Sequence, residues 1–116
     1  MVQPIPNLVI SNALRASLAG WSKTLASEVA KDGVTVNVVL PGRIETDRTG
    51  EIDAVNAKTQ GKSLEEIAAA ARATIPAGRY GRVQEFADVV CFLASERASY
   101  VTGGMIRVDG GAVRSV

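Results

Sequence analysis

The chain has 116 residues, of which 47% are hydrophobic and 22% charged, and its formal net charge is +1. This composition predicts one globular domain, excludes a disordered chain, and lacks the clustered Lys and Arg that a nucleic-acid partner requires. There is no histidine and one cysteine, no apolar run reaches the ~18 residues of a membrane span, and the first residues do not form a signal peptide, so we expect a cytoplasmic protein with no metal site, disulfide or membrane partner.

The first predicted element is a helix from about Val9 to Lys31. Pro4 and Pro6 predict an irregular start before it. Asp32-Gly33 is typical of a helix end, because glycine accepts the left-handed backbone found there. Five apolar residues at spacings of 4, 3, 4 and 4 form one stripe along the helix: Leu14, Leu18, Trp21, Leu25 and Val29.

A strand is predicted next, from Val34 to Leu40. Its sequence, "VTVNVVL", is β-branched and almost continuously apolar, which is typical of a strand buried on both faces of a parallel sheet. Pro41-Gly42 ends it. Residues 43–62 are polar, contain two glycines and show no clean period, so they are predicted to form a long loop, and such loops are often functional.

The last third of the chain contains two predicted helices and a strand. Ser63-Leu64-Glu65-Glu66 is a capping box that starts a helix. A further helix is predicted from Val83 to Ser95, with Phe86, Val89, Val90 and Leu93 on one face. Residues 102–104 form a turn, Met105–Val108 a short strand, and "DGG" at residues 109–111 another turn.

The order of helix, strand, long loop, two helices and strand predicts an α/β fold with a parallel pair of strands. Two strands are too few for a stable sheet. Residues 1–116 are therefore expected to form a single partial domain at one edge of a larger doubly wound, Rossmann-type sheet.

Four stretches in order carry a resemblance to a known family: "GVTVNVVLPGRIET", "PAGRYG", "EFADVVCFLAS" and "YVTGGMIRVDGG". They resemble the C-terminal half of the short-chain dehydrogenase/reductase family, over about residues 11–112. The resemblance implies a Rossmann-type domain whose glycine-rich fingerprint and catalytic serine lie in an N-terminal half that these residues do not contain.

The stretch after the predicted strand matches the family's P-G-x-I-x-T pattern at Pro41, Gly42, Ile44 and Thr46. The resemblance implies that NAD or NADP binds here, with backbone groups of Ile44 facing the nicotinamide carboxamide and the Thr46 hydroxyl nearby. The alternative is a tight turn capped by Thr46, with no ligand. Residues 43–62 match the family's substrate-covering segment, which implies a small-molecule substrate. The alternative for this segment is a disordered surface loop.

Catalysis in the family uses a Y-x-x-x-K pair on the first helix, and the spacing of four puts both side chains on one face. Aligning Ser11 with the serine that often precedes the lysine puts Asn12 at the lysine position and Leu8 at the tyrosine position. Neither side chain can perform the expected proton transfer. Arg15, one turn on from Asn12, is a poor substitute for lysine, so no catalytic residue is assigned.

Other polar side chains have structural interpretations. Arg79 is expected to pair with Glu85, or with Glu51 or Asp53, and Asp109 to hold the terminal turn. Cys91 is expected to be a buried, inert thiol. Three basic side chains would either meet an anionic substrate or cofactor phosphate or be solvated: Arg43, Arg48 and Lys58. The two tyrosines, Tyr80 and Tyr100, are expected to be structural.

The resemblance implies an NAD(P)-dependent oxidoreductase acting on an alcohol or carbonyl, and the missing groups predict that residues 1–116 alone are inactive and bind no cofactor. The alternative is a non-catalytic cofactor-binding or self-associating module of the same fold. The apolar stripe of the first helix and the open sheet edge predict a homo-oligomer. The sequence does not separate NAD from NADP, because the deciding residue lies in the other half of the family's fold.

Overall fold

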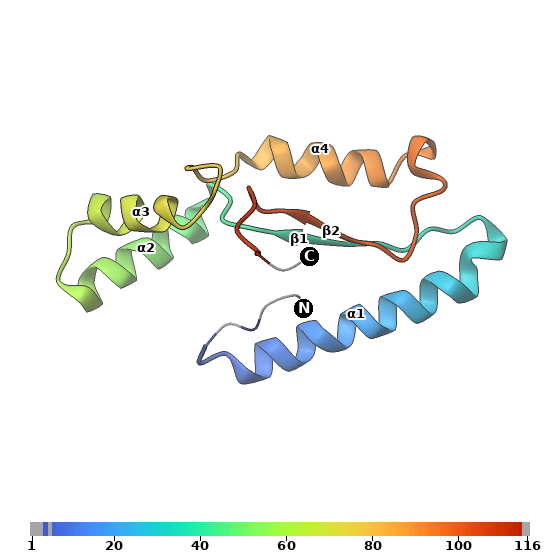
Figure 1. The fold of residues 1–116 in the computed structure, drawn as a ribbon, viewed down its shortest axis with the longest axis horizontal. Helices are drawn as coiled ribbons and strands as arrows, with labels where there is room; N and C mark the ends of the chain where they lie inside the picture. Colours follow the sequence, from blue (N-terminus) through green and yellow to red (C-terminus); the bar gives the residue numbers. More distant parts are fainter. Residues whose placement is uncertain (1–3, 5, 115–116) are drawn as a thin grey trace. The chain divides into compact units, whose positions relative to one another are not determined.

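The computed structural model describes residues 4 and 6–114 of the chain (Figure 1). The elements in order are α1 (Val9–Val29), η1 (Ala30–Asp32), β1 (Val38–Pro41), α2 (Asp47–Gln60), α3 (Leu64–Ala73), α4 (Val83–Leu93), η2 (Glu96–Ala98) and β2 (Met105–Val108). They divide into two compact units: a first unit of the residues up to Leu40 together with Val89–Arg107, and a second unit of Pro41–Asp88 with Val108–Arg114.

β1 and β2 form a two-stranded sheet. The Val38 N–H donates to the Gly104 carbonyl at 3.0 Å, and the Gly42 N–H donates to the Val108 carbonyl at 2.9 Å. The pairing thus advances along both strands in the same direction, so the strands are parallel. The predicted α/β class and the parallel pair are both confirmed.

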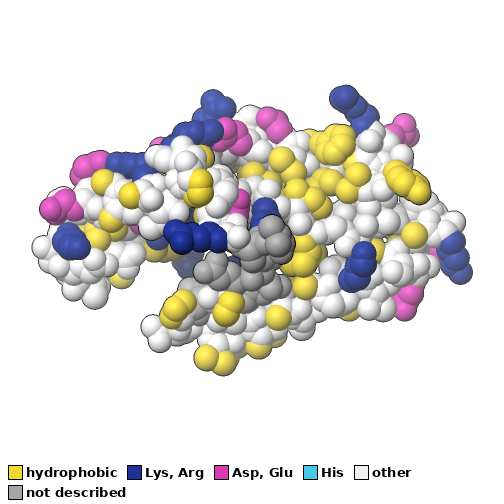
Figure 2. All heavy atoms as spheres, viewed as in Figure 1, with side chains coloured by type: hydrophobic (Ala, Val, Ile, Leu, Met, Phe, Trp, Pro, Cys, Tyr) yellow, Lys and Arg dark blue, Asp and Glu magenta, His cyan; other side chains and the backbone are white. Residues whose placement is uncertain are grey.

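In the first unit, α1 begins at its predicted residue and ends at Val29, two residues before its predicted end. The 3-10 turn η1 follows it and is closed by Gly33, whose φ of 74° is left-handed. Its buried residues are Ser22 and Ala26, and a β-carbon at Gly103 would lie 3.5 Å from the Ala26 β-carbon. Packing within the unit therefore uses a face of small side chains. The N-terminal part of the predicted apolar stripe is exposed, with exposed fractions of 54–63% at Leu14, Leu18 and Trp21. Figure 2 shows hydrophobic side chains on the molecular surface.

The predicted strand Val34–Leu40 forms only in its second half. Before β1 begins, the chain is held to the segment preceding β2 partly by side chains. The Val36 N–H donates to Thr102 Oγ1 at 3.0 Å, and the Gly103 N–H donates to the Val36 carbonyl at 2.7 Å. The strand residues are half-buried rather than buried on both faces as predicted, because β2 is their one strand neighbour among the described residues.

In the second unit, the prediction of a loop over residues 43–62 is wrong, because α2 occupies Asp47–Gln60. The Thr46 side chain accepts from the Thr49 N–H at its start, and Gly61, with φ of 62°, ends it. Its one buried residue is Asp53. A helix that buries a carboxylate in place of an apolar stripe has no 3.6-residue hydrophobic period, so the pattern gave no signal.

α3 begins at the predicted capping box, with the Ser63 and Glu66 side chains each accepting from the other's backbone N–H. It buries Ile67 and lies beside α2 (Figure 1). α4 ends at Leu93, two residues before its predicted end. Cys91 is exposed rather than buried, because it lies off the helix face that carries the half-buried Phe86 and Val89.

Candidate functional site

The P-G-x-I-x-T turn follows β1 within the second unit, and its glycine is required by a close approach of two backbones. A β-carbon at Gly42 would stand 2.5 Å from the Asp109 Cα. The Asp109 carboxylate accepts from the N–H groups of Gly111, at 2.9 Å, and Val113, at 3.1 Å. The predicted structural role of Asp109 in the terminal turn is confirmed, and this turn is what backs Gly42.

Ile44 is fixed by a parallel bridge to Gly81. The Glu45 N–H donates to the Gly81 carbonyl at 2.8 Å, and the Gly81 N–H donates to the Arg43 carbonyl at 2.9 Å. The Ile44 carbonyl accepts from Thr49 Oγ1 at 2.6 Å. Within residues 4 and 6–114, however, the Ile44 N–H donates to no protein acceptor. The turn therefore offers backbone donors to a ligand, the Ile44 N–H among them.

Thr46 is the N-cap of α2. Its Oγ1 accepts from the Thr49 N–H at 3.4 Å and lies 3.2 Å from Thr49 Oγ1. This is the local geometry of the ligand-free interpretation, a turn capped by Thr46. The structure thus brings Pro41, Gly42, Ile44 and Thr46 together in one turn, immediately before a helix N-terminus.

Three polar side chains that the sequence analysis did not connect meet beside this turn. Arg43 Nη1 donates to Asp53 Oδ1 at 2.7 Å, and the Tyr80 hydroxyl donates to Asp53 Oδ2 at 2.7 Å. Arg43 Nη1 also lies 3.3 Å from the Tyr80 hydroxyl, and its guanidinium carbon is 5.8 Å from the centre of the Tyr80 ring. The Asp53 side chain is 4% exposed and that of Arg43 39%.

Burial acts to raise the pKa of Asp53, but the hydrogen bonds from Tyr80 and Arg43 outweigh it, and the pKa is lowered. Burial and the Asp53 hydrogen bond raise the pKa of Tyr80. Asp53 is thus a carboxylate held ionised inside the unit by two donors. Arg43 is engaged with this carboxylate rather than solvated as expected. The cap pair Thr46 and Gly61 could have revealed α2 from the sequence, but no local signal reports the cluster itself.

The predicted pair of Arg79 and Glu85 is confirmed. The Arg79 guanidinium binds both Glu85 carboxylate oxygens, at 2.7 and 2.8 Å, and the Arg82 N–H donates to the same carboxylate at 2.7 Å. Arg79, and then the Arg82 N–H, hold the pKa of Glu85 well below its usual range. The pair fixes the chain at the start of α4.

In the first unit, the start of α1 borders a hollow that contains two of the three positions considered for catalysis. Leu8 is the residue before α1, and its carbonyl accepts from the Asn12 N–H at 2.8 Å. Ser11 and Arg15, four residues apart, line the hollow with Leu8, whereas Asn12 does not. The lining consists of Asn7, Leu8, Val9, Ile10, Ser11, Leu14 and Arg15.

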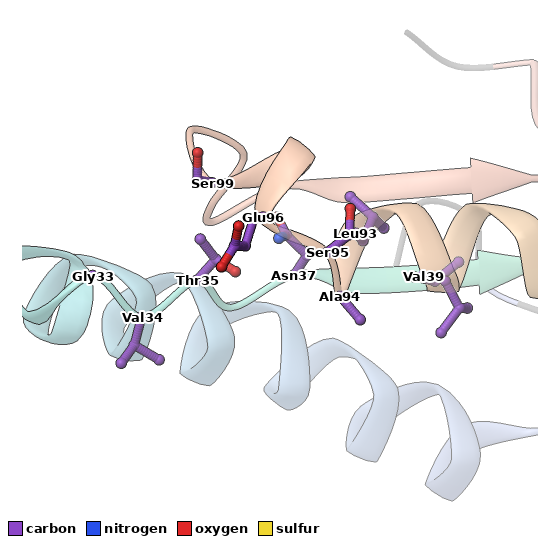
Figure 3. A pocket seen from close by; sticks show the side chains of 11 residues that line it. Gly33, Val34, Thr35, Asn37, Val39, Leu93, Ala94, Ser95, Glu96 and Ser99 are labelled. Carbon is purple, nitrogen blue, oxygen red and sulfur yellow. The ribbon is translucent and has the colours of Figure 1, made fainter.

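A second recess of the first unit lies between the segment leading into β1 and the end of α4 (Figure 3). The side chain of Asn37 is at its wall, where Nδ2 donates to the Val101 carbonyl at 2.8 Å and Oδ1 accepts from the Gly104 N–H at 3.1 Å. Thr35 and Glu96 lie beside it. The polar groups of Asn37 are thus already used within the protein, and this recess offers a ligand less than the turn does.

Neither a membrane-spanning helix nor a cluster of metal-ligating side chains occurs in the described part of the chain. The tyrosines differ in their surroundings: Tyr80 is bonded to Asp53, while Tyr100 is fully exposed.

Comparisons with known proteins show which family the chain belongs to. The family model described as "Enoyl-(Acyl carrier protein) reductase" matches residues 1–113. The 3-oxoacyl-[acyl-carrier-protein] reductase FabG of Salmonella typhimurium is 48% identical over 99 residues, which are 85% of this chain and 36% of that protein. The chain therefore spans about a third of the length of this curated relative.

Solved structures agree. A short chain dehydrogenase family protein from Francisella tularensis aligns with a TM-score of 0.90 and 31% identity, over 97% of this chain and 46% of that one. L-sorbose reductase from Gluconobacter frateurii, solved with NADPH and L-sorbose, aligns with a TM-score of 0.90 and 34% identity, over 99% and 44%. The predicted Rossmann-type class is confirmed, and the chain belongs to the short-chain dehydrogenase/reductase family.

Proposed function

We propose that this chain is the C-terminal, cofactor-facing part of an NADPH-dependent reductase that acts on a small carbonyl substrate. One observation carries the proposal: within residues 4 and 6–114, the Ile44 N–H of the turn at Pro41, Gly42, Ile44 and Thr46 has no protein acceptor. NADPH in the L-sorbose reductase structure supports NADPH over NADH. The identity to 3-oxoacyl-[acyl-carrier-protein] reductase supports a 3-oxoacyl thioester as the first substrate to test.

In this proposal the cofactor supplies the hydride, and the residues of this chain bind and orient it. The Ile44 N–H donates to the nicotinamide carboxamide. Thr46 caps α2 by accepting from the Thr49 N–H. The N–H groups of Asp47 and Arg48 at the start of that helix have no partner within it, and in this proposal they are further donors for the ligand. Gly42 allows the turn to pack against Asp109 without a side chain between them.

Residues 1–116 by themselves are proposed to be inactive and to bind no cofactor. The chain covers 36% of the FabG relative, and the family's tyrosine and lysine are replaced. A second candidate, a non-catalytic cofactor-binding or self-associating module, is favoured by that replacement alone.

The protein is further proposed to be a cytoplasmic homo-oligomer that associates through α1 and the sheet edge. Leu14, Leu18 and Trp21 are each more than half exposed, and their spacings of 4 and 3 put them on one side of α1. β1 has one strand neighbour within the described residues. Burying this apolar surface against a second copy would remove it from water. Light scattering at micromolar concentration tests this, and a monomer would contradict it.

The turn is tested in the intact protein that carries this chain, by titrating NADPH and NADH against its fluorescence. Ile44→Pro removes the N–H donor, and Ile44→Val, which keeps it, is the matched control. We expect Ile44→Pro to bind NADPH about tenfold or more weakly, the loss of one well-placed hydrogen bond, and Ile44→Val to bind as wild type does. Equal NADPH affinity of the two variants would refute the role of the turn. If the wild-type protein binds NADPH but reduces no substrate in a panel of carbonyl compounds, the second candidate is favoured.

A further inference from the structure

α2 is attached to the rest of its unit in an unusual way. The buried residue of this 14-residue helix is Asp53, whereas Ile52 and Val55 beside it are 41% and 62% exposed. Surface helices ordinarily attach through an apolar stripe. In α2 a carboxylate occupies the inward position, so the polar contacts of that carboxylate decide where the helix lies.

Those contacts reach two other segments of the second unit. Arg43, between Gly42 and Ile44 of the turn, donates to Oδ1, and Tyr80, next to Gly81 of the Ile44 bridge, donates to Oδ2, both at 2.7 Å. The Asp53 carboxylate therefore joins α2 to both segments of the parallel bridge between Ile44 and Gly81. Each carboxylate oxygen has its own donor, which is the condition under which a buried charge is tolerated.

The charges around Asp53 are balanced by local partners. Besides Arg43 and Tyr80, Arg72 of α3 contributes an attractive charge. Arg72 is itself bonded to Glu65 on the exposed side of α3. Removal of the Asp53 charge would leave the Arg43 guanidinium without its carboxylate partner. Because the Arg43 side chain is 39% exposed, water would screen part of that loss.

We propose that Asp53 is a positioning residue that fastens α2 to the cofactor-binding turn, so that loss of its carboxylate releases α2 and weakens nicotinamide cofactor binding without removing any group that touches the cofactor. The effect on the cofactor rests on the function proposed above. The fastening of α2 does not, because it concerns only residues within one unit.

The fastening is tested by hydrogen exchange in the intact protein that carries this chain. Asp53→Asn keeps the shape and removes the charge, and Tyr80→Phe removes one hydrogen bond while keeping the ring. Glu51→Gln removes a charge from the exposed side of the same helix and is the matched control. We expect exchange in residues 47–60 to rise about tenfold or more in Asp53→Asn, less in Tyr80→Phe, and not in Glu51→Gln, since hydrogen bonds to charged groups are the stronger ones.

The cofactor arm measures the NADPH dissociation constant of the same variants, with an expected weakening of about tenfold in Asp53→Asn, within the usual range of coupling between sites. Unchanged exchange in residues 47–60, or an equal rise in α1 and α4, would overturn the fastening. Raised exchange with unchanged NADPH affinity would overturn the coupling to the turn. Failure of the wild-type protein to bind NADPH would instead refute the proposed function, with the exchange result still deciding the role of Asp53.

Discussion

The backbone of Gly42 lies so close to that of Asp109 that a β-carbon at position 42 would stand 2.5 Å from the Asp109 Cα and 2.8 Å from its Cβ. The atoms that it would meet belong to or adjoin backbone, and the Asp109 carboxylate is held by two N–H groups. Asp109 therefore cannot swing aside. The glycine of the motif is required here by the fold itself, before any ligand is considered.

Gly42→Ala is accordingly expected to lower the free energy of unfolding by about 1–3 kcal/mol, the usual cost of overpacking. Gly50→Ala is the matched control, since nothing lies within 4 Å of a β-carbon at that position of α2, and it should raise stability by about 0.5–1 kcal/mol. Urea unfolding of the intact protein measures both. Equal effects of the two substitutions would contradict the close approach.

Asn37→Ala is expected to destabilise the first unit by about 1–3 kcal/mol, because the Val101 carbonyl and the Gly104 N–H each lose their side-chain partner. Gln60→Ala, at an exposed position of α2, should change the free energy of unfolding by about 0.5 kcal/mol or less, the range of ordinary surface changes. Thermal unfolding with both variants in parallel checks the difference. A loss of less than about 0.5 kcal/mol in Asn37→Ala would contradict this, because water would then replace both hydrogen bonds without a measurable loss of stability.

The Asp53 cluster predicts a pH dependence with two arms. The pKa of Asp53 is lowered below its ordinary 3.8, so its ionised form adds stability that is complete above that value and lost as the pH falls through the folded pKa. The pKa of Tyr80 is raised above its ordinary 10.0, so its contribution is complete below that value and lost as the pH rises further.

Unfolding midpoints measured from about pH 2 to pH 11 check both arms. Asp53→Asn should make the acid arm shallower, with the remainder due in part to Glu85, whose pKa is also lowered, and Tyr80→Phe should flatten the alkaline arm. Glu51→Gln is the control outside the cluster. An acid slope in Asp53→Asn equal to that of wild type would assign the whole arm to other carboxylates.

The start of α1 offers two registers for the family's tyrosine and lysine. One puts them at Leu8 and Asn12 and the other, with the same spacing, at Ser11 and Arg15. The hollow beside the helix is lined by both residues of the second pair and by only Leu8 of the first, which favours the second. We therefore expect Ser11→Tyr/Arg15→Lys to raise turnover of a carbonyl substrate by on the order of 10²-fold, the lower range of general acid catalysis.

Leu8→Tyr/Asn12→Lys is the matched counterpart, with the same two side chains introduced three residues earlier. Steady-state reduction assays on the intact protein, with NADPH binding measured in each variant, compare the two. A larger gain in the counterpart would establish the register in which Leu8 and Asn12 stand at the catalytic positions.

The elements that sequence predicted well are those whose cause is local. α1 and α4 show an apolar period, Ser63 and Glu66 form a capping box, and β2 occupies its predicted residues, Met105–Val108. α2 was missed because the feature that fixes it is not local. Asp53 is ten residues from Arg43 and 27 from Tyr80, and no periodicity of hydrophobic residues reports such a contact.

The candidate site divides in the same way. The P-G-x-I-x-T motif predicted the turn at Gly42 and Ile44, and the "DGG" turn predicted that Asp109 holds the terminal turn, because each depends on a short stretch of backbone. The Asp53 cluster, and an Ile44 N–H without an acceptor in the part of the chain that the structure describes, depend on how separate segments meet, so only the structure shows them.

Arg43 occupies the first variable position of the P-G-x-I-x-T motif, and it is the residue through which the turn holds α2. The motif does not specify the residue at position 43, yet in this chain that residue connects the turn to α2. If residues 47–73 of this chain are transferred into a relative, residues 43 and 80 must be transferred with them. Otherwise Asp53 is buried without either of its two donors.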